Sequence, residues 1–230
     1  MNPARLAKIE RSLLICAFTL CSLFVVLLIA LKWPSYWVYI ASEQTPMTWL
    51  QSVIWFGCVL FALLSFTLLY IQEGLRRHAL TWLMLAGAFL FLMMDERFAF
   101  HERVRDHYLK PAGIKILPWM EAGDFILLMY AVVALAFVIP IYRVYRVRRT
   151  ALIWLGIAAI LFATAVGMDT LDVSKMSKAT ERFEQSMEEI IELLAVLSLF
   201  SSVWLMIGFY LSAFRGSAAA AVSEEQSGEG

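Results

Sequence analysis

The chain has 230 residues, of which 61% are hydrophobic and 17% are charged, and its mean hydropathy is +0.73. So much apolar surface excludes an ordinary soluble domain and predicts a polytopic α-helical membrane protein. The formal net charge is zero, and without a basic face a nucleic-acid partner is not expected.

A membrane-spanning helix needs about 20 apolar residues, and six runs of the sequence reach or approach that length. The predicted spans cover residues 12–32, 48–71, 80–101, 120–142, 151–170 and 188–212. Together they predict one six-helix transmembrane domain over residues 1–215. The segment 216–230 is rich in Ala, Ser, Gly and Glu, and we expect it to be a disordered C-terminal tail.

The connections between the spans differ in character. Residues 33–39 are aromatic, as segments at the membrane interface are. The longest connection, 103–118, contains prolines and a glycine, and 142–149 is strongly basic. Residues 171–187 are polar, and we expect part of them to extend the sixth helix beyond the membrane.

Arg and Lys residues set the predicted orientation. The two sides carry nearly equal numbers, but on the side of the termini the basic residues lie in short loops with few acids. The positive-inside rule therefore places both termini in the cytoplasm. The opposite ends of spans three to six then face the outside, and the bacterial inner membrane is the expected location.

Acidic residues concentrate at those outer ends. Thirteen of the nineteen fall in the windows 95–124 and 169–192, and they meet at one membrane face if the chain threads as predicted. Helical spacing puts Asp95 and Glu102 on one face, seven residues apart, and pairs Glu188 with Glu192. Two further pairs share a face in the same way: Glu121 with Asp124, and Asp169 with Asp172. Spans three to six are thus expected to form a bundle around an acidic/His site.

Solvated helix ends are one interpretation of these acids. The helix dipole favours acids at helix N-termini by about 0.3–1 kcal/mol, which suits Glu121, Asp124, Glu188 and Glu189. The dipole opposes acids at helix C-termini, and Asp95 also lies inside an apolar run, where an acid costs about 2.5–3.5 kcal/mol. A positive partner is therefore expected. It is either a bound divalent metal or one of the arginines at positions 97, 103 and 105.

A metal site is the first of these alternatives. Carboxylates from several helices with one histidine match the preferences of Fe, Mn or Zn, and helix bundles build di-metal sites from such side chains. No Glu-x-x-His element occurs, so a ferritin-like site does not follow. The candidate metal ligands are Asp95, His101, Glu102, Glu188 and Glu192. The candidate catalytic residues, as general bases or groups that orient the ligands, are Glu96, Glu189, Asp124 and Asp169.

Two of these motifs also carry a resemblance. The run Asp-Glu-x4-His-Glu at residues 95–102 and the later Glu-Glu-x-x-Glu at 188–192 resemble a group of uncharacterised bacterial multipass membrane proteins. The resemblance implies a shared polar site and brings no activity with it. The ceramidase-like hydrolases, which hold zinc with three histidines, do not fit, because the chain has no His-x-x-x-His pair.

Three functions remain open. The first is a metal-dependent membrane enzyme that acts on a lipid or another apolar small molecule. The second is a cation or proton transporter or channel, since acids within a membrane commonly mark such paths. The third is a non-catalytic membrane subunit or sensor, in which an Arg–carboxylate network takes the place of a metal.

Overall fold

The structure, a computed structural model, describes residues 3–42, 44–116, 123, 125–169 and 176–228, and these residues form helices and no strands. In chain order the helices are α1 (Pro3–Lys32), α2 (Trp37–Ile40), α3 (Pro46–Glu73), α4 (Arg77–Phe98), α5 (Phe100–Val104), the π-helix η1 (Arg105–Leu109), α6 (Phe125–Ala136), α7 (Val138–Tyr145), α8 (Arg149–Asp169) and α9 (Lys178–Gly228). Five of them are long and apolar enough to cross a membrane, and the bent pair α6–α7 makes a sixth if it is one span. The described part of the chain is therefore all-helical with several candidate apolar spans, which is consistent with an integral membrane protein.

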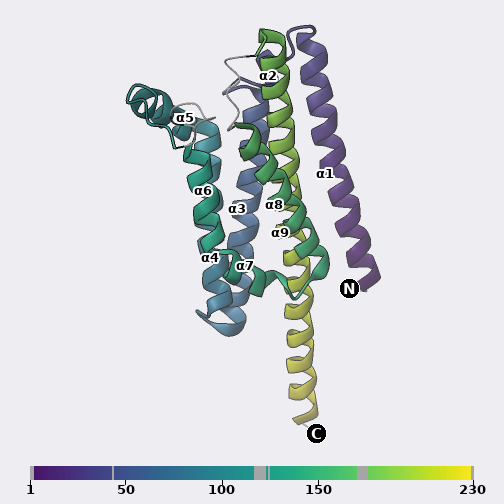
Figure 1. The fold of residues 1–230 in the computed structure, drawn as a ribbon. Coiled ribbons are helices and arrows are strands. Elements are labelled where there is room, and N and C mark those ends of the chain that lie inside the picture. The colour runs from purple at the N-terminus through teal and green to yellow at the C-terminus, as the bar shows by residue number, and fades with distance from the viewer. Residues whose placement is uncertain (1–2, 43, 117–122, 124, 170–175, 229–230) are drawn as a thin grey trace.

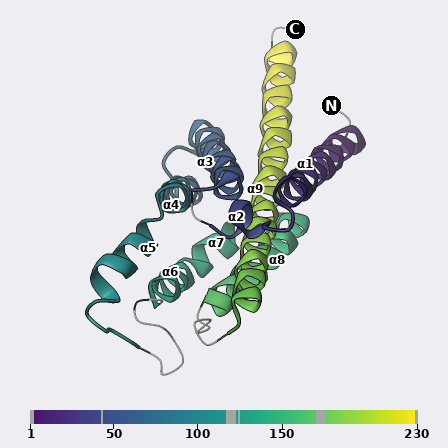
Figure 2. The same ribbon diagram turned by 90° about the horizontal axis from the view of Figure 1, so that it is seen from above.

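Helix α9 packs against several other helices of the bundle (Figures 1 and 2). It packs most extensively against α8 and α3, and α3 packs in turn against α4. The apolar stretch of α9 is the most buried of the candidate spans, whereas those of α1 and α8 are the least buried. Helix α1 begins and α9 ends at the same end of the bundle (Figure 1).

Aromatic side chains fill the core between these helices. Trp55 of α3 lies between Phe89 of α4 and Phe162 of α8, with ring centroids 5.8 Å away in both directions. The buried Trp82 of α4 donates its indole N–H to the Tyr210 hydroxyl of α9 at 2.9 Å. This hydrogen bond satisfies a polar group that would be costly to leave alone in an apolar core.

The fourth predicted span is not one straight helix. Helix α6 ends at Ala136, α7 begins at Val138, and their axes are bent by 55°. Pro140 accounts for the bend, because it has no N–H to donate to the Ala136 carbonyl and its ring crowds that oxygen. At the break itself, Phe137 donates its N–H to the Ala134 carbonyl, three residues back, at 3.0 Å. One continuous helix over 120–142 was expected, and the structure has two helices with a bend between them.

The third predicted span also ends earlier than expected. Helix α4 stops at Phe98, and Ala99 takes a left-handed conformation with φ 48° and ψ 49°. The chain then continues as α5 and η1, which leave the bundle sideways (Figure 2). The segment from 103, which we expected to be a loop, is therefore helical as far as Leu109.

Helix α9 is longer than its apolar stretch at both ends. It begins at Lys178, as expected for an extension of the sixth helix, and the Ser177 hydroxyl accepts the Thr180 N–H at 3.2 Å as an N-cap does. At the other end the helix continues to Gly228. The four alanines 218–221 have the highest helix propensity of any residue, which favours this continuation.

Candidate functional site

The break at Ala99 creates a histidine–carboxylate pair. By turning the chain, it brings His101 of α5 back onto Asp95 of α4. The His101 backbone N–H donates to Oδ1 of Asp95 at 2.9 Å, and the His101 Nδ1 lies 2.9 Å from Oδ2. Asp95 is buried, with 4% of its surface exposed. A continuous helix would have kept Asp95 and Glu102 on one face, and the break at Ala99 corrects that expectation. The partner of Asp95 is His101.

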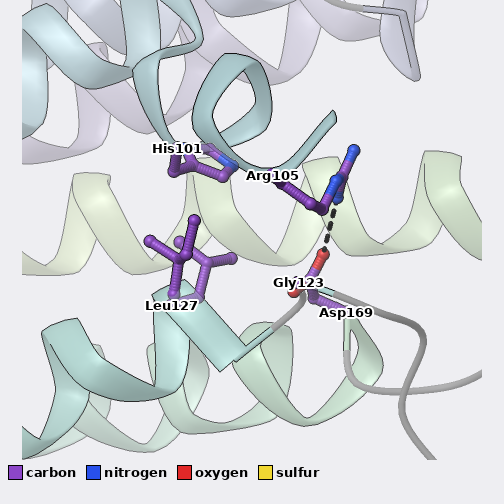
Figure 3. A pocket seen from close by; sticks show the side chains of 6 residues that line it. His101, Arg105, Gly123, Leu127 and Asp169 are labelled. Carbon is purple, nitrogen blue, oxygen red and sulfur yellow. Dashed lines mark ion pairs between the residues drawn. The ribbon is translucent and has the colours of Figure 1, made fainter. Parts of the chain in front are cut away.

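Arg105, the first residue of η1, joins acids from two parts of the chain. Its guanidinium lies 3.1 Å from Glu102 and 3.1 Å from Asp106. It also lies 4.0 Å from Asp169 at the end of α8 (Figure 3). Burial disfavours the cation, but the charges of the three carboxylates and the hydrogen bond to Asp106 outweigh it and raise the pKa of Arg105. Among the arginines offered by the sequence, Arg105 is thus a cation that offsets these acids.

The first turns of α9 bring further acids to the same end of the bundle. Glu188 interacts electrostatically with Asp169 of α8, with Glu184 and Glu192 of α9, and with Arg105. Helix α3 supplies a polar neighbour, because the Gln51 amide donates to the Glu189 carbonyl at 3.2 Å. Asp169, Glu188 and Glu192, which lie on different helices or turns, therefore belong to one electrostatic group with Arg105.

A narrow crevice joins the two halves of the site. His101, Arg105, Gly123, Ile126, Leu127 and Asp169 line it (Figure 3), and it is too narrow for a water molecule. Gly123 has φ 95°, and a Cβ there would come within 2.7 Å of the Arg105 Cγ. Only glycine permits this close approach of the chain to Arg105. The crevice thus places the imidazole and the guanidinium next to the beginning of α6.

The remaining predicted site residues are Glu96, Glu189 and Asp124. Glu96 lies half-buried on α4, and Glu189 is half-buried on α9 beside Gln51. Asp124, together with Glu121 and Asp172, lies outside the described residues. Within the part of the chain that the structure describes, no three His, Cys, Asp or Glu side chains are grouped so that they could hold a metal ion.

Sequence reasoning missed two contributors to this end of the bundle. Gln51 is fully buried on α3, and Thr48 and Ser52 beside it are also buried. Three polar residues at such helical spacing in an apolar run are the signal that points to a polar partner. Gly123 had no such signal, because its close approach to Arg105 depends on the fold.

Comparison with known proteins places the chain in a family. No curated protein and no solved structure matches it. A family model described as a domain of unknown function (DUF8692) matches residues 15–206, which is most of the chain. The protein therefore belongs to the DUF8692 family.

Proposed function

We propose that the end of the bundle opposite the termini is a carboxylate/histidine centre that binds a divalent cation. The observation that carries the proposal is the environment of Glu188, which interacts with three other carboxylates. Neighbouring like charges disfavour each other's ionised forms, and a bound cation relieves that repulsion. We further propose that the centre serves a membrane enzyme whose substrate is a lipid or another apolar small molecule.

The geometry favours separate roles for the candidate ligands. Both oxygens of Asp95 engage His101. Carboxylates hold metal-binding imidazoles in this way, so we assign Asp95 to orienting His101. Glu102, Glu188 and Glu192 would supply oxygens, and together with the imidazole they suit Fe, Mn or Zn. Since the described side chains do not converge on one point, binding requires the glutamates to rotate towards the cation. A cation there would polarise a carbonyl or phosphoryl oxygen of a substrate.

The orientation of the bundle in the membrane is also part of the proposed function. The basic connection at residues 142–149 and both ends of the chain lie at the end away from α5, the helix that carries His101 (Figure 1). The positive-inside rule supports placing that end in the cytoplasm and the centre at the outer face of a bacterial inner membrane.

The contacts of Arg105 favour a second candidate function. Its guanidinium already lies within 4.0 Å of three carboxylates. If arginine is the cation that this end of the bundle requires, the protein is a non-catalytic membrane subunit or sensor that binds no metal.

Elemental analysis separates the two candidates. The full chain is purified in detergent, incubated with Mn²⁺, Fe²⁺ or Zn²⁺ and desalted. The cation centre predicts about one or two retained ions per chain, and it predicts their loss in Glu102→Gln and in Glu192→Gln. Glu73→Gln is the matched control, because Glu73 is exposed and ends α3 at the other end of the bundle. A wild-type protein that retains no ion supports the arginine network, and retention in both variants overturns the ligand assignment.

A further inference from the structure

The segment that carries His101 and Arg105 also displays an exposed apolar stripe. Phe100, Val104 and Tyr108 follow one another at intervals of four residues along α5 and η1, and their exposed fractions are 39%, 44% and 66%. Side chains at this spacing lie above one another on one helix face. A soluble surface seldom presents such a stripe without a partner.

The segment has two other faces. His101, Arg105 and Leu109 are half-buried towards the bundle, where the first two line the crevice. The exposed Arg103, Asp106 and Lys110 form the polar face. With about 100° per residue, the centre of this polar face lies more than a quarter turn from the centre of the apolar stripe. The segment is thus amphipathic in the part that does not contact the bundle.

We propose that α5–η1 lies in the headgroup layer of a phospholipid leaflet, with its apolar stripe turned to the acyl chains and its polar face to water. Three observations identify this partner. The segment begins where α4, a candidate span, ends. It runs away from the other helices across the direction of the bundle (Figures 1 and 2). Its stripe contains a phenylalanine and a tyrosine, and such aromatic and apolar side chains with charges opposite are typical of interfacial helices.

A groove beside the stripe fits the same partner. It has a volume of about 650 Å³, and Phe100, Val104 and Tyr108 form its apolar wall. Arg103 and His107 lie at the same groove and suit a phosphate group. The carboxylates of Glu102 and Asp106 also line it, but both are paired with Arg105. A lipid of the leaflet could therefore place a chain along the wall and its headgroup near Arg103.

This inference goes beyond the proposed cation centre and does not depend on it. It concerns the position of the site, because His101 and Arg105 lie on the same α5–η1 segment as the stripe. Contact between the stripe and the leaflet would fix both site residues at headgroup depth, where an amphiphilic molecule can reach them from the membrane plane.

Spin-label accessibility tests the proposal on the full chain in nanodiscs of phosphatidylcholine and phosphatidylglycerol. A single label is placed at Val104→Cys, Tyr108→Cys or Arg103→Cys in a Cys16→Ser background, in which the remaining Cys21 and Cys58 are buried. All three labelled positions are exposed, so the substitutions leave the packing intact. Oxygen, which partitions into lipid, and a water-soluble nickel chelate then compete to relax each label.

The expected result is a several-fold higher oxygen-to-nickel ratio at positions 104 and 108 than at the adjacent control position 103. Equal ratios at 103 and 104 would show that the two faces do not differ in their contact with lipid and would overturn the proposal. A short distance between Val104 labels on two chains, measured in discs that hold two copies, would assign the stripe to a second copy and overturn it as well. Metal content is not involved in either outcome, so the test is separate from that of the cation centre.

Discussion

Glu10 and Arg148, which are 138 residues apart, form a two-pronged ion pair inside the bundle. The Arg148 Nη2 lies 2.6 Å from Oε2 of Glu10, and Nη1 lies 3.1 Å from Oε1. The Glu10 side chain is 5% exposed, and Nη1 of Arg148 also donates to the Leu205 carbonyl of α9. The pair thus connects α1 to the beginning of α8 and to α9. Helix α1 is one of the least buried candidate spans.

Removal of one charge from this pair should destabilise the protein. Glu10→Gln leaves a buried guanidinium without its counter-charge, and such losses cost about 3 kcal/mol at the lower end of their range. We place the pair at that lower end because one fifth of the Arg148 side chain is exposed. Unfolding in detergent by a chemical denaturant measures the change. Glu73→Gln is the control, because its partner Arg76 is exposed and 3.9 Å away, so a change of about 0.5 kcal/mol or less is expected. Equal effects of the two substitutions would contradict the role of the buried pair.

A side chain at Gly208 of α9 should also destabilise the protein, because it would disturb the Glu10–Arg148 ion pair. A Cβ at this position would overlap the Glu10 carboxylate and lie 3.2 Å from the Arg148 Nη1. Gly208→Ala should therefore cost about 1–3 kcal/mol, as overpacking does. Gly156→Ala is the control, since nothing lies within 4 Å of its Cβ and alanine is the better helix former. In a Glu10→Ala background Gly208→Ala should lose most of its cost, and additive effects in this double-mutant cycle would count against the contact.

The sequence predicts the spans well because their signal is local. Apolar runs of membrane length identify α1, α3, α4, α8 and α9, and the structure has a helix at each. The differences arise where one residue changes the backbone. Ala99 adopts a left-handed conformation without being glycine, so composition offers no warning of the end of α4. Pro140 is visible in the sequence, but whether a proline bends a span depends on how its neighbours satisfy the freed carbonyl.

The sequence indicates which end of the bundle carries the acids, and it indicates their pairing less well. Hydropathy alone brings the acids of α8 and α9 to one end of the bundle, and Asp169 and Glu188 do interact. The partner of Asp95 could not be predicted from helical spacing, because His101 reaches it only through the turn at Ala99. The Glu10–Arg148 pair joins residues 138 positions apart in the sequence, and no local pattern indicates such a contact.

Asp95→Asn should change the tautomer of His101. The Asp95 carboxylate accepts only, so it favours a proton on the His101 Nδ1, which lies 2.9 Å from it. An asparagine can turn its amide N–H₂ towards Nδ1 and favour the other tautomer. Nitrogen NMR of histidine-labelled protein should show this switch for His101 alone. His78 and His107 are internal controls, and an unchanged His101 spectrum would contradict the assigned hydrogen bond.

Labelling from outside the cell tests the orientation. Ile116, in the connection after η1, is 58% exposed, and Val147, in the basic connection between α7 and α8, is 51% exposed. In the Cys16→Ser background, an impermeant maleimide should label Ile116→Cys on intact cells and Val147→Cys only after permeabilisation. The positive-inside rule gives this expectation, and the reverse pattern would put the site on the cytoplasmic side.

Arg105→Gln should destabilise the protein in a pH-dependent way. It removes the guanidinium from three carboxylates and should cost about 2 kcal/mol at pH 7. Burial tends to raise the pKa of Asp106, but the hydrogen bond to Arg105 and the charges of Arg105 and Lys110 outweigh it and lower that pKa. A lowered pKa in the folded state contributes stability that is complete above the unfolded pKa of about 3.9 and is lost as the pH falls below it. The gap between wild type and variant should therefore narrow when unfolding is measured at pH 3 instead of pH 6. Arg103→Gln, at the exposed neighbouring position, should change stability by about 0.5 kcal/mol or less at both pH values. A gap that stays constant with pH would show that Arg105 contributes through packing, without the ion pairs.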